Sequence, residues 1–281
     1  MAASLELIVA ATRRRISLRK AGNGRSYDLR SMESAAAGHS PRGFRKRLRE
    51  VAQHGIAVIA ELKKASPSKG LIRADFEPAG LARELETAGA AALSVLTDEE
   101  FFQGSLENLR AASANASLPC LRKDFIVDEI QIVEARANCA DAILLIVAAL
   151  EQKELVTLAA NARLYGLDVL CEAHDEMELE RALDAGCDLI GINSRNLRTF
   201  EVTVDTALRL GEKIPADCVR VAESGIQSGA DVARLRSAGY EAFLIGESLM
   251  KAERPGDALA KLRKEARIAM SRQLISLKTE S

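Results

Sequence analysis

The chain has 281 residues, of which 48% are hydrophobic and 28% charged, and its formal net charge is −1. This composition excludes a disordered chain, a collagen-like repeat and a coiled coil. The longest apolar run, residues 142–150, is about half of the ~20 residues that a membrane span needs, so no membrane segment is predicted. The five cysteines include no C-x-x-C pair. We therefore expect a cytoplasmic protein without a zinc site or a disulfide framework.

The first part of the chain is predicted to be a helical extension. Helical patterns cover residues 5–18 and 44–54, and a loop rich in Gly, Ser and Asn is expected over 22–40. Residues 1–50 hold twelve basic and four acidic side chains, whereas the remainder holds 27 basic and 36 acidic ones. The near-zero net charge is thus an average over a basic extension and an acidic body.

From residue 57 onward, short apolar runs alternate with amphipathic segments of helical length. The runs are rich in Val, Ile and Leu, as parallel strands buried on both faces should be. They cover residues 57–60, 91–96, 118–121, 142–147, 168–171, 189–192, 219–222 and 242–245. The clearest helical segments cover residues 76–88, 128–138, 151–165, 176–185 and 229–238.

Eight strand–helix repeats predict an α/β fold, a (β/α)8 TIM barrel with an N-terminal helical extension. We expect the extension over residues 1–54, the catalytic barrel over 55–270 and a C-terminal tail over 271–281. A doubly wound open sheet is the competing fold. It is disfavoured because no G-x-G-x-x-G motif opens a helix.

The active site of such a barrel lies at the C-terminal ends of its strands. Ionisable or amide side chains follow six of the eight apolar runs, and they include Glu61, Lys63, Lys123, Glu172, His174, Asn193, Arg195, Glu223 and Glu247. A single charged residue after a strand is usually a solvated loop residue. Two lysines and three carboxylates at one barrel mouth would instead shift one another's pKa values and sustain acid–base chemistry.

Small residues after the last two strands predict a phosphate site. Ser224 and Gly225 follow one strand, and Gly246 and Glu247 follow the next. Backbone N–H groups often hold a phosphate at this position in barrel enzymes. No cluster has metal-ligand spacing, so no metal is predicted, and His174 is interpreted as a surface histidine.

Six blocks of the sequence, spread over residues 44–252, resemble the indole-3-glycerol-phosphate synthase family of tryptophan biosynthesis. The most specific block covers residues 59–70 and reads Ile-Ala-Glu-Leu-Lys-Lys-Ala-Ser-Pro-Ser-Lys-Gly. The other blocks cover residues 94–105, 121–126, 191–197, 222–226 and 244–250. The resemblance implies a carboxy-lyase that needs no cofactor. Its substrate would be 1-(2-carboxyphenylamino)-1-deoxyribulose 5-phosphate, and its products indole-3-glycerol phosphate, CO₂ and water.

The resemblance also implies roles for individual residues. Lys123 would be the general acid of the ring closure and Glu172 the general base that completes the indole. Lys63 would hold the anionic substrate and act as an acid in the dehydration. The other residues would support these three. Glu61 and Glu223 would set the charge and position of the lysines, and Asn193 and Arg195 would orient the substrate. The phosphate would be bound by Ser224, Gly225, Gly246 and Glu247, with Ser66 at the rim of the same pocket, and Phe102 and Phe125 would pack on the anthranilate ring.

In family members the basic extension folds across the barrel mouth, where it would attract a doubly anionic substrate. The alternative interpretation is that these basic residues form a solvated helical face.

Three other functions compete with the synthase. Another phosphosugar barrel, such as phosphoribosylanthranilate isomerase, should lack the 59–70 block, and a non-catalytic barrel subunit should have lost Lys63, Lys123 or Glu172. A nucleic-acid site should interleave aromatic residues with the basic ones.

We therefore expect a small phosphosugar as the partner of this protein, with no nucleic acid and no membrane. Other enzymes of the tryptophan pathway are the candidate protein partners.

Overall fold

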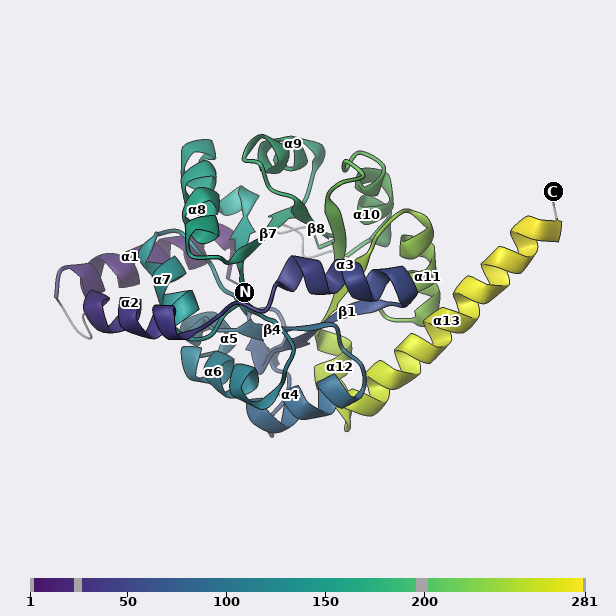
Figure 1. The fold of residues 1–281 in the computed structure, drawn as a ribbon, viewed down its shortest axis with the longest axis horizontal. Coiled ribbons are helices and arrows are strands. Elements are labelled where there is room, and N and C mark those ends of the chain that lie inside the picture. Colours follow the sequence, from purple (N-terminus) through teal and green to yellow (C-terminus); the bar gives the residue numbers. More distant parts are fainter. Residues whose placement is uncertain (1–2, 23–26, 196–201, 280–281) are drawn as a thin grey trace.

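The computed structural model describes residues 3–22, 27–195 and 202–279. Eight parallel strands close into a barrel in the order β1-β10-β9-β8-β7-β6-β5-β4 (Figure 1). They are β1 (Ala57–Leu62), β4 (Ala92–Leu96), β5 (Cys120–Lys123), β6 (Ala142–Ile146), β7 (Asp168–Ala173), β8 (Leu189–Asn193), β9 (Val219–Glu223) and β10 (Ala242–Ile245). Each strand overlaps one of the eight predicted runs, so the predicted (β/α)8 barrel is confirmed.

Helices surround the barrel and follow its strands in the chain. The longer ones are α4 (Pro78–Thr87), α6 (Leu106–Asn115), α7 (Ile130–Ala137), α8 (Gln152–Leu164), α9 (Glu176–Asp184), α10 (Val204–Gly211), α11 (Gly229–Ser237) and α13 (Pro255–Thr279). Shorter elements are α5 (Glu99–Phe102), α12 (Glu247–Lys251), the 3₁₀ turn η1 (Val147–Ala149) and the small antiparallel pair β2 (Ala65–Ser66) and β3 (Gly70–Leu71). Helix α13 runs without a break across residue 270, and the division of the chain at that residue stays a prediction.

The hydrophobic core has two layers that follow from the alternation of side chains along a strand. Outward residues such as Val58 and Cys171 pack against the helices, and inward residues such as Ile59 and Leu170 fill the barrel. Strands buried on both faces explain why the runs are almost continuously apolar. No helix in the described part of the chain is long and apolar enough to cross a membrane.

Three helices precede the barrel: α1 (Leu5–Lys20), α2 (Leu29–Gly38) and α3 (Phe44–His54). The expected loop over residues 22–40 is therefore wrong where it covers α2, and residues 23–26 of that range lie outside the described part. The backbone forms a helix here because Asp28 caps its start, accepting a hydrogen bond from the Ser31 amide. The helix buries Ala36 and packs against α7.

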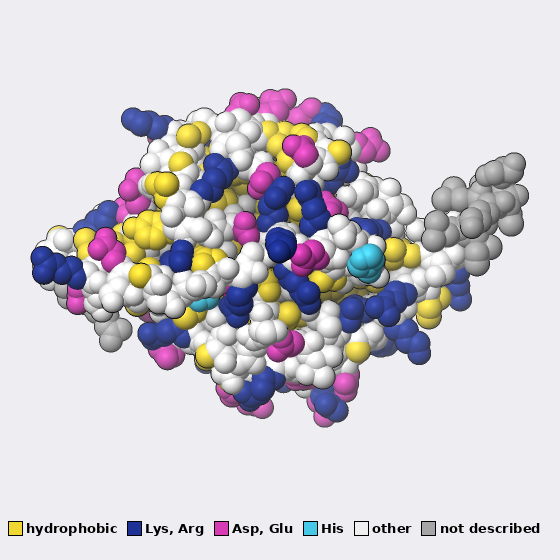
Figure 2. Space-filling view, in the orientation of Figure 1, with side chains coloured by type: hydrophobic (Ala, Val, Ile, Leu, Met, Phe, Trp, Pro, Cys, Tyr) yellow, Lys and Arg dark blue, Asp and Glu magenta, His cyan; other side chains and the backbone are white. Residues whose placement is uncertain are grey.

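Helix α3 closes the N-terminal end of the barrel (Figure 1). Phe44 and Leu48 are fully buried and belong to the same cluster as the inward residues of the strands. The outer side of α3 is basic, and Figure 2 shows Lys and Arg side chains gathered over it at the centre of this face. The helix therefore works as a plug with an apolar inner side.

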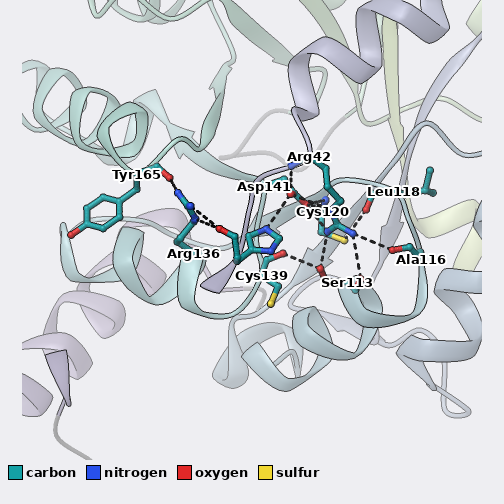
Figure 3. Close-up of polar contacts among 10 residues, drawn as sticks. Arg42, Ser113, Ala116, Leu118, Cys120, Arg136, Cys139, Asp141 and Tyr165 are labelled. Carbon is teal, nitrogen blue, oxygen red and sulfur yellow. Dashed lines mark hydrogen bonds and ion pairs between the residues drawn. The ribbon is translucent and has the colours of Figure 1, made fainter. Parts of the chain in front are cut away.

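The loop between α2 and α3 is held to the barrel by a buried ionic cluster, shown in Figure 3. Asp141, which precedes β6, is fully buried. Its carboxylate accepts hydrogen bonds from the backbone and guanidinium of Arg42 at 2.6–3.2 Å and from the Cys120 amide at 2.6 Å. His39 Nε2 lies 3.2 Å away, and Arg42 also donates to Ser113 Oγ at 2.7 Å. We call these residues the Arg42–Asp141 cluster.

Candidate active site

A cavity of about 630 Å³ opens at the C-terminal ends of the barrel strands. All fourteen residues predicted for catalysis or substrate binding line it, namely Glu61, Lys63, Ser66, Phe102, Lys123, Phe125, Glu172, Asn193, Arg195, Glu223, Ser224, Gly225, Gly246 and Glu247. They come from strands or loops far apart in the sequence, and the barrel closure brings them to one place. Asn196, another polar residue after β8, lies outside the described residues.

Four of these side chains form one layer across the mouth. Glu61, Lys123, Glu172 and Glu223 stand at the ends of β1, β5, β7 and β9, which are alternate strands of the barrel. Alternate strands of a (β/α)8 barrel contribute their inward side chains to the same layer. Chain alternation thus puts one ammonium group among three carboxylates, while a neighbouring residue such as Cys171 faces the helices.

Lys123 is the centre of this layer. Its Nζ donates hydrogen bonds to Glu172 Oε2 and Glu223 Oε2, both at 2.9 Å. The lysine side chain is 13% exposed, and the two carboxylates are 4% and 2% exposed. A charged group buried this deeply is stable only with such partners. The cluster therefore holds a proton donor in a fixed position facing the cavity.

The three groups shift one another's pKa values. Burial alone would lower the pKa of Lys123, but Glu172, Glu223 and Glu61 raise it well above its ordinary value. Burial alone would raise the pKa of Glu172, but Lys123 and His174 hold it well below the ordinary range. Burial raises the pKa of Glu223 to about 8, and Glu172 adds to that rise. One lysine thus stays protonated beside one ionised and one weakly acidic carboxyl group.

Lys63 forms a second pair at the edge of the layer. Its Nζ donates a hydrogen bond to Glu61 Oε1. A Cβ atom at Gly246 would clash with the same Oε1 atom, so only glycine leaves room for the Glu61 carboxylate. The two lysines therefore reach the cavity from different strands, each held by a carboxylate.

The loops after β9 and β10 carry the predicted phosphate site. Ser224 and Gly225 both have positive φ, at 62° and 76°. A non-glycine residue in this region is strained, and such strain is concentrated at functional sites. After the neighbouring strand β10, Glu247 is paired with Lys251 at 2.5 Å, and Lys69 and Lys63 help to lower its pKa, against the effect of burial. Several cations therefore surround this side of the cavity.

The opposite side of the cavity is apolar. The rings of Phe102 and Phe125 lie 6.0 Å apart at an angle of 40°. Leu144 and Ile146 of β6 contribute to the same lining. Such a wall suits a flat aromatic group, and the polar groups opposite would fix its orientation.

Some residues of the site were not predicted from the sequence. Lys69 lines the cavity although only its block had been singled out, and Leu5 and Ile8 of α1 line it with apolar side chains. The interpretation of His174 as a surface histidine is wrong, because its side chain is 11% exposed and pairs with Glu172. The available signal was a histidine only two positions after the catalytic candidate Glu172.

The extension reaches the mouth through α1, and the attraction of substrate by its basic charges stays a prediction. The basic residues of α3 lie at the end of the barrel opposite the mouth. Those of α1 pair with carboxylates of the barrel, in the pairs Arg13–Glu154, Arg15–Asp98, Arg19–Glu134 and Lys20–Asp128. What α1 brings to the mouth is apolar surface, and its positive charges are used to hold the helix in place.

Among the described residues, no group of three or more His, Cys, Asp or Glu side chains is arranged to hold a metal ion. The acid–base groups of the mouth are instead neutralised by lysines and by His174. The arrangement offers a proton donor, a proton acceptor, an anion-binding rim and an aromatic wall in one cavity.

Comparison with known proteins places these residues in context. The sequence model of the family described as Indole-3-glycerol phosphate synthase matches residues 5–262. The indole-3-glycerol phosphate synthase of Koribacter versatilis is 59% identical over 262 residues, covering 93% of this chain and 99% of that protein. The protein of the same name from Burkholderia vietnamiensis is 53% identical over 239 residues, covering 85% and 92%.

Solved structures show the same fold at much lower identity. Thiamine phosphate pyrophosphorylase from Pyrococcus furiosus superposes with a TM-score of 0.58 at 16% identity, covering 76% of this chain and 97% of that one. A crystal structure of mandelate oxidase with (S)-2-phenylpropionate reaches a TM-score of 0.57 at 16% identity, covering 86% and 93%. At these identities the likeness concerns the barrel alone.

Proposed function

The chain belongs to the indole-3-glycerol phosphate synthase family, the carboxy-lyases of tryptophan biosynthesis, and we propose that the layer around Lys123 is its catalytic centre. The reaction closes the pyrrole ring of 1-(2-carboxyphenylamino)-1-deoxyribulose 5-phosphate, a phosphosugar, and releases CO₂ and water. The observation that carries the proposal is Lys123 Nζ at 2.9 Å from both Glu172 and Glu223. It puts a protonated acid and an ionised base side by side in the cavity.

The first step is the condensation. The ring carbon that bears the carboxylate attacks the ketone carbon, and the ketone oxygen takes a proton from Lys123. The raised pKa of Lys123 keeps this proton in place until negative charge develops on the oxygen. The bond from the ring to the carboxylate then breaks, its electrons restore the aromatic ring, and CO₂ leaves.

The second step is the dehydration. Lys63 protonates the hydroxyl group as it leaves as water, and Glu172 removes a proton from the carbon next to the nitrogen. Lys123 is the strongest of the influences that lower the pKa of Glu172. Because Lys123 has given up its proton in the first step, that influence is then gone. Glu172 becomes a stronger base at the stage where a base is needed.

The rest of the cavity binds the substrate. Backbone N–H groups of Ser224, Gly225, Gly246 and Glu247 hold the phosphate, with the charge of Lys63 and Lys69 nearby. Phe102 and Phe125 pack on the anthranilate ring, and Asn193, Arg195 and Ser66 orient the sugar from the rim. Binding both ends of a flexible substrate brings the ring carbon to the ketone.

The protein is proposed to work in the cytoplasm. All five cysteines are free, and four of them are buried, which fits a reducing compartment.

An assay of the purified chain tests the proposed function. The chain contains no Trp, so the fluorescence of the indole product is observed without tryptophan background from the protein. We expect product from the carboxyphenylamino sugar phosphate, and a much higher KM for the same compound without its phosphate. Absence of product from the phosphorylated substrate contradicts the proposal, and an equal KM for both compounds contradicts the phosphate site.

A further inference from the structure

Two further charged side chains, His174 and Glu178, lie next to Glu172 on the side away from the cavity. His174 Nε2 lies 3.4 Å from Glu172 Oε1, the oxygen that Lys123 does not contact. On the other side of the imidazole, Nδ1 lies 2.9 Å from Glu178 Oε2. The same Glu178 oxygen accepts a hydrogen bond from the His174 backbone amide at 2.8 Å. The ring therefore bridges two carboxylates.

The geometry determines the protonation state of this ring. A lone pair on either nitrogen would face a carboxylate oxygen, which is repulsive, so both nitrogens carry a proton. The pKa of His174 agrees: burial alone would lower it, but the carboxylates of Glu172 and Glu178 raise it to about 10. His174 is thus an imidazolium ion at neutral pH.

His174 has no direct access to the substrate. Glu172 lines the cavity, and His174 is not among the residues that do. Glu178 lies in the first turn of α9, where its amide donates a hydrogen bond to the capping residue Asp175 at 2.9 Å. The imidazolium is therefore held by a rigid helix start and reaches the reaction only through Glu172.

From these contacts we infer that His174 is a positioning residue, which holds Glu172 Oε1 while Lys123 holds Oε2. Two cations on opposite oxygens fix the plane of the carboxylate. When Lys123 has delivered its proton, His174 is the cation that keeps Glu172 ionised and in place for the dehydration. This inference rests on the proposed role of Glu172 as the base.

The inference predicts a change in pH dependence. The charged groups that face Glu172 are Lys123, His174 and the neighbouring carboxyl of Glu223. Both cations favour the ionised form of Glu172, so removing the imidazolium raises its pKa. The acidic limb of the kcat profile, which requires Glu172 to be ionised, then moves to higher pH.

The test compares His174→Ala, His174→Gln and Glu178→Gln by steady-state kinetics over a range of pH. We expect His174→Ala to lower kcat by about tenfold or more, as the loss of an orienting partner does at other sites, with KM changed by less than about twofold because the substrate contacts stay. His174→Gln keeps a donor without the charge, so it should recover part of kcat but keep the shifted limb. Glu176→Gln removes a half-exposed carboxylate that pairs with Lys213 in the same turn of α9, away from His174, so it is the matched control and should keep the wild-type kcat and pH profile.

A double variant separates this inference from the proposed function. In a Glu172→Gln background, His174→Ala should have no further effect on kcat. If Glu172→Gln is inactive but folded His174→Ala and His174→Gln both keep normal kcat and an unshifted acidic limb, the positioning role is wrong. If Glu172→Gln itself keeps normal turnover, the proposed base is wrong instead.

Discussion

Each end of the barrel carries a buried ionic cluster, and the two clusters differ in how completely their atoms are paired. In the Arg42–Asp141 cluster both oxygens of Asp141 accept hydrogen bonds from several donors, and neither residue lines the cavity at the mouth. At the mouth, Glu223 Oε1 is buried without a hydrogen-bond partner among the described residues, and the layer faces a cavity of about 630 Å³.

This difference separates a structural ionic cluster from a functional one. A buried charge is tolerated when every polar atom is paired, and such a cluster holds two segments together. A buried polar atom without a hydrogen-bond partner lowers the stability of the fold unless a ligand or a transition state provides that partner. The Arg42–Asp141 cluster thus anchors the extension to the barrel. The cluster at the mouth keeps a polar atom free to form a hydrogen bond with the substrate.

The largest expected effect is on turnover at the mouth. Lys123→Ala removes the proposed acid and Glu172→Gln the proposed base. Each should lower kcat at least about a hundredfold, near the low end of what acid–base catalysis supplies. The measurement is kcat from product fluorescence, with circular dichroism to show that the variant is folded.

These two variants also sharpen the comparison of the two clusters. Lys123→Ala leaves the buried carboxylates of Glu172 and Glu223 without their shared cation, so a loss of stability accompanies the loss of activity. A folded Lys123→Ala protein with normal kcat would show that the charged layer at the mouth has a structural role, like the Arg42–Asp141 cluster at the other end of the barrel.

The second effect is on stability at the other end of the barrel. Arg42→Ala removes the main partner of the fully buried Asp141. Breaking such a pair should lower the free energy of unfolding by about 3 kcal/mol, while kcat per folded molecule stays normal because the cluster is far from the mouth. Urea unfolding followed by circular dichroism measures it.

Arg47→Ala is the matched control, because Arg47 is an exposed arginine on α3, the helix that begins directly after the loop that contains Arg42. It should change stability by less than about 0.5 kcal/mol. A stability loss in Arg42→Ala no larger than in Arg47→Ala would contradict the anchoring role.

The barrel and most of the site could be predicted from the sequence because both depend on local pattern. Apolar runs mark buried strands, and the chain order of a (β/α)8 barrel sends the residue after each run to one mouth. Strands β1, β7 and β9 extend further than their runs, so that Glu61, Glu172 and Glu223 are the last or nearly the last residues of these strands. A hydrophobic run stops at a charged residue even where the strand continues.

What could not be predicted depends on contacts between distant segments. The position of α3 at the closed end follows from Phe44 and Leu48 packing inside the barrel, which no local pattern specifies. The charges of α1 were counted correctly as basic, but their pairing with barrel carboxylates appears only in three dimensions.

The smallest expected effect concerns long-range attraction of the substrate, and it compares a cation of α1 with a cation of the mouth. Arg13 is 2.9 Å from Glu154, so the pair adds little net field. Lys69 lines the cavity and influences Glu247 there. Lys69→Gln should therefore raise KM by a few-fold and weaken its dependence on salt, because screening acts on an uncompensated charge.

Arg13→Gln should leave KM and its salt dependence unchanged and cost at most about 1 kcal/mol of stability, the usual range for an exposed ion pair. The measurement is KM for the phosphosugar at low and at physiological ionic strength for both variants. If Arg13→Gln flattens the salt dependence as much as Lys69→Gln does, the extension attracts substrate after all. The basic charge of the N-terminus would then serve binding as well as attachment to the barrel.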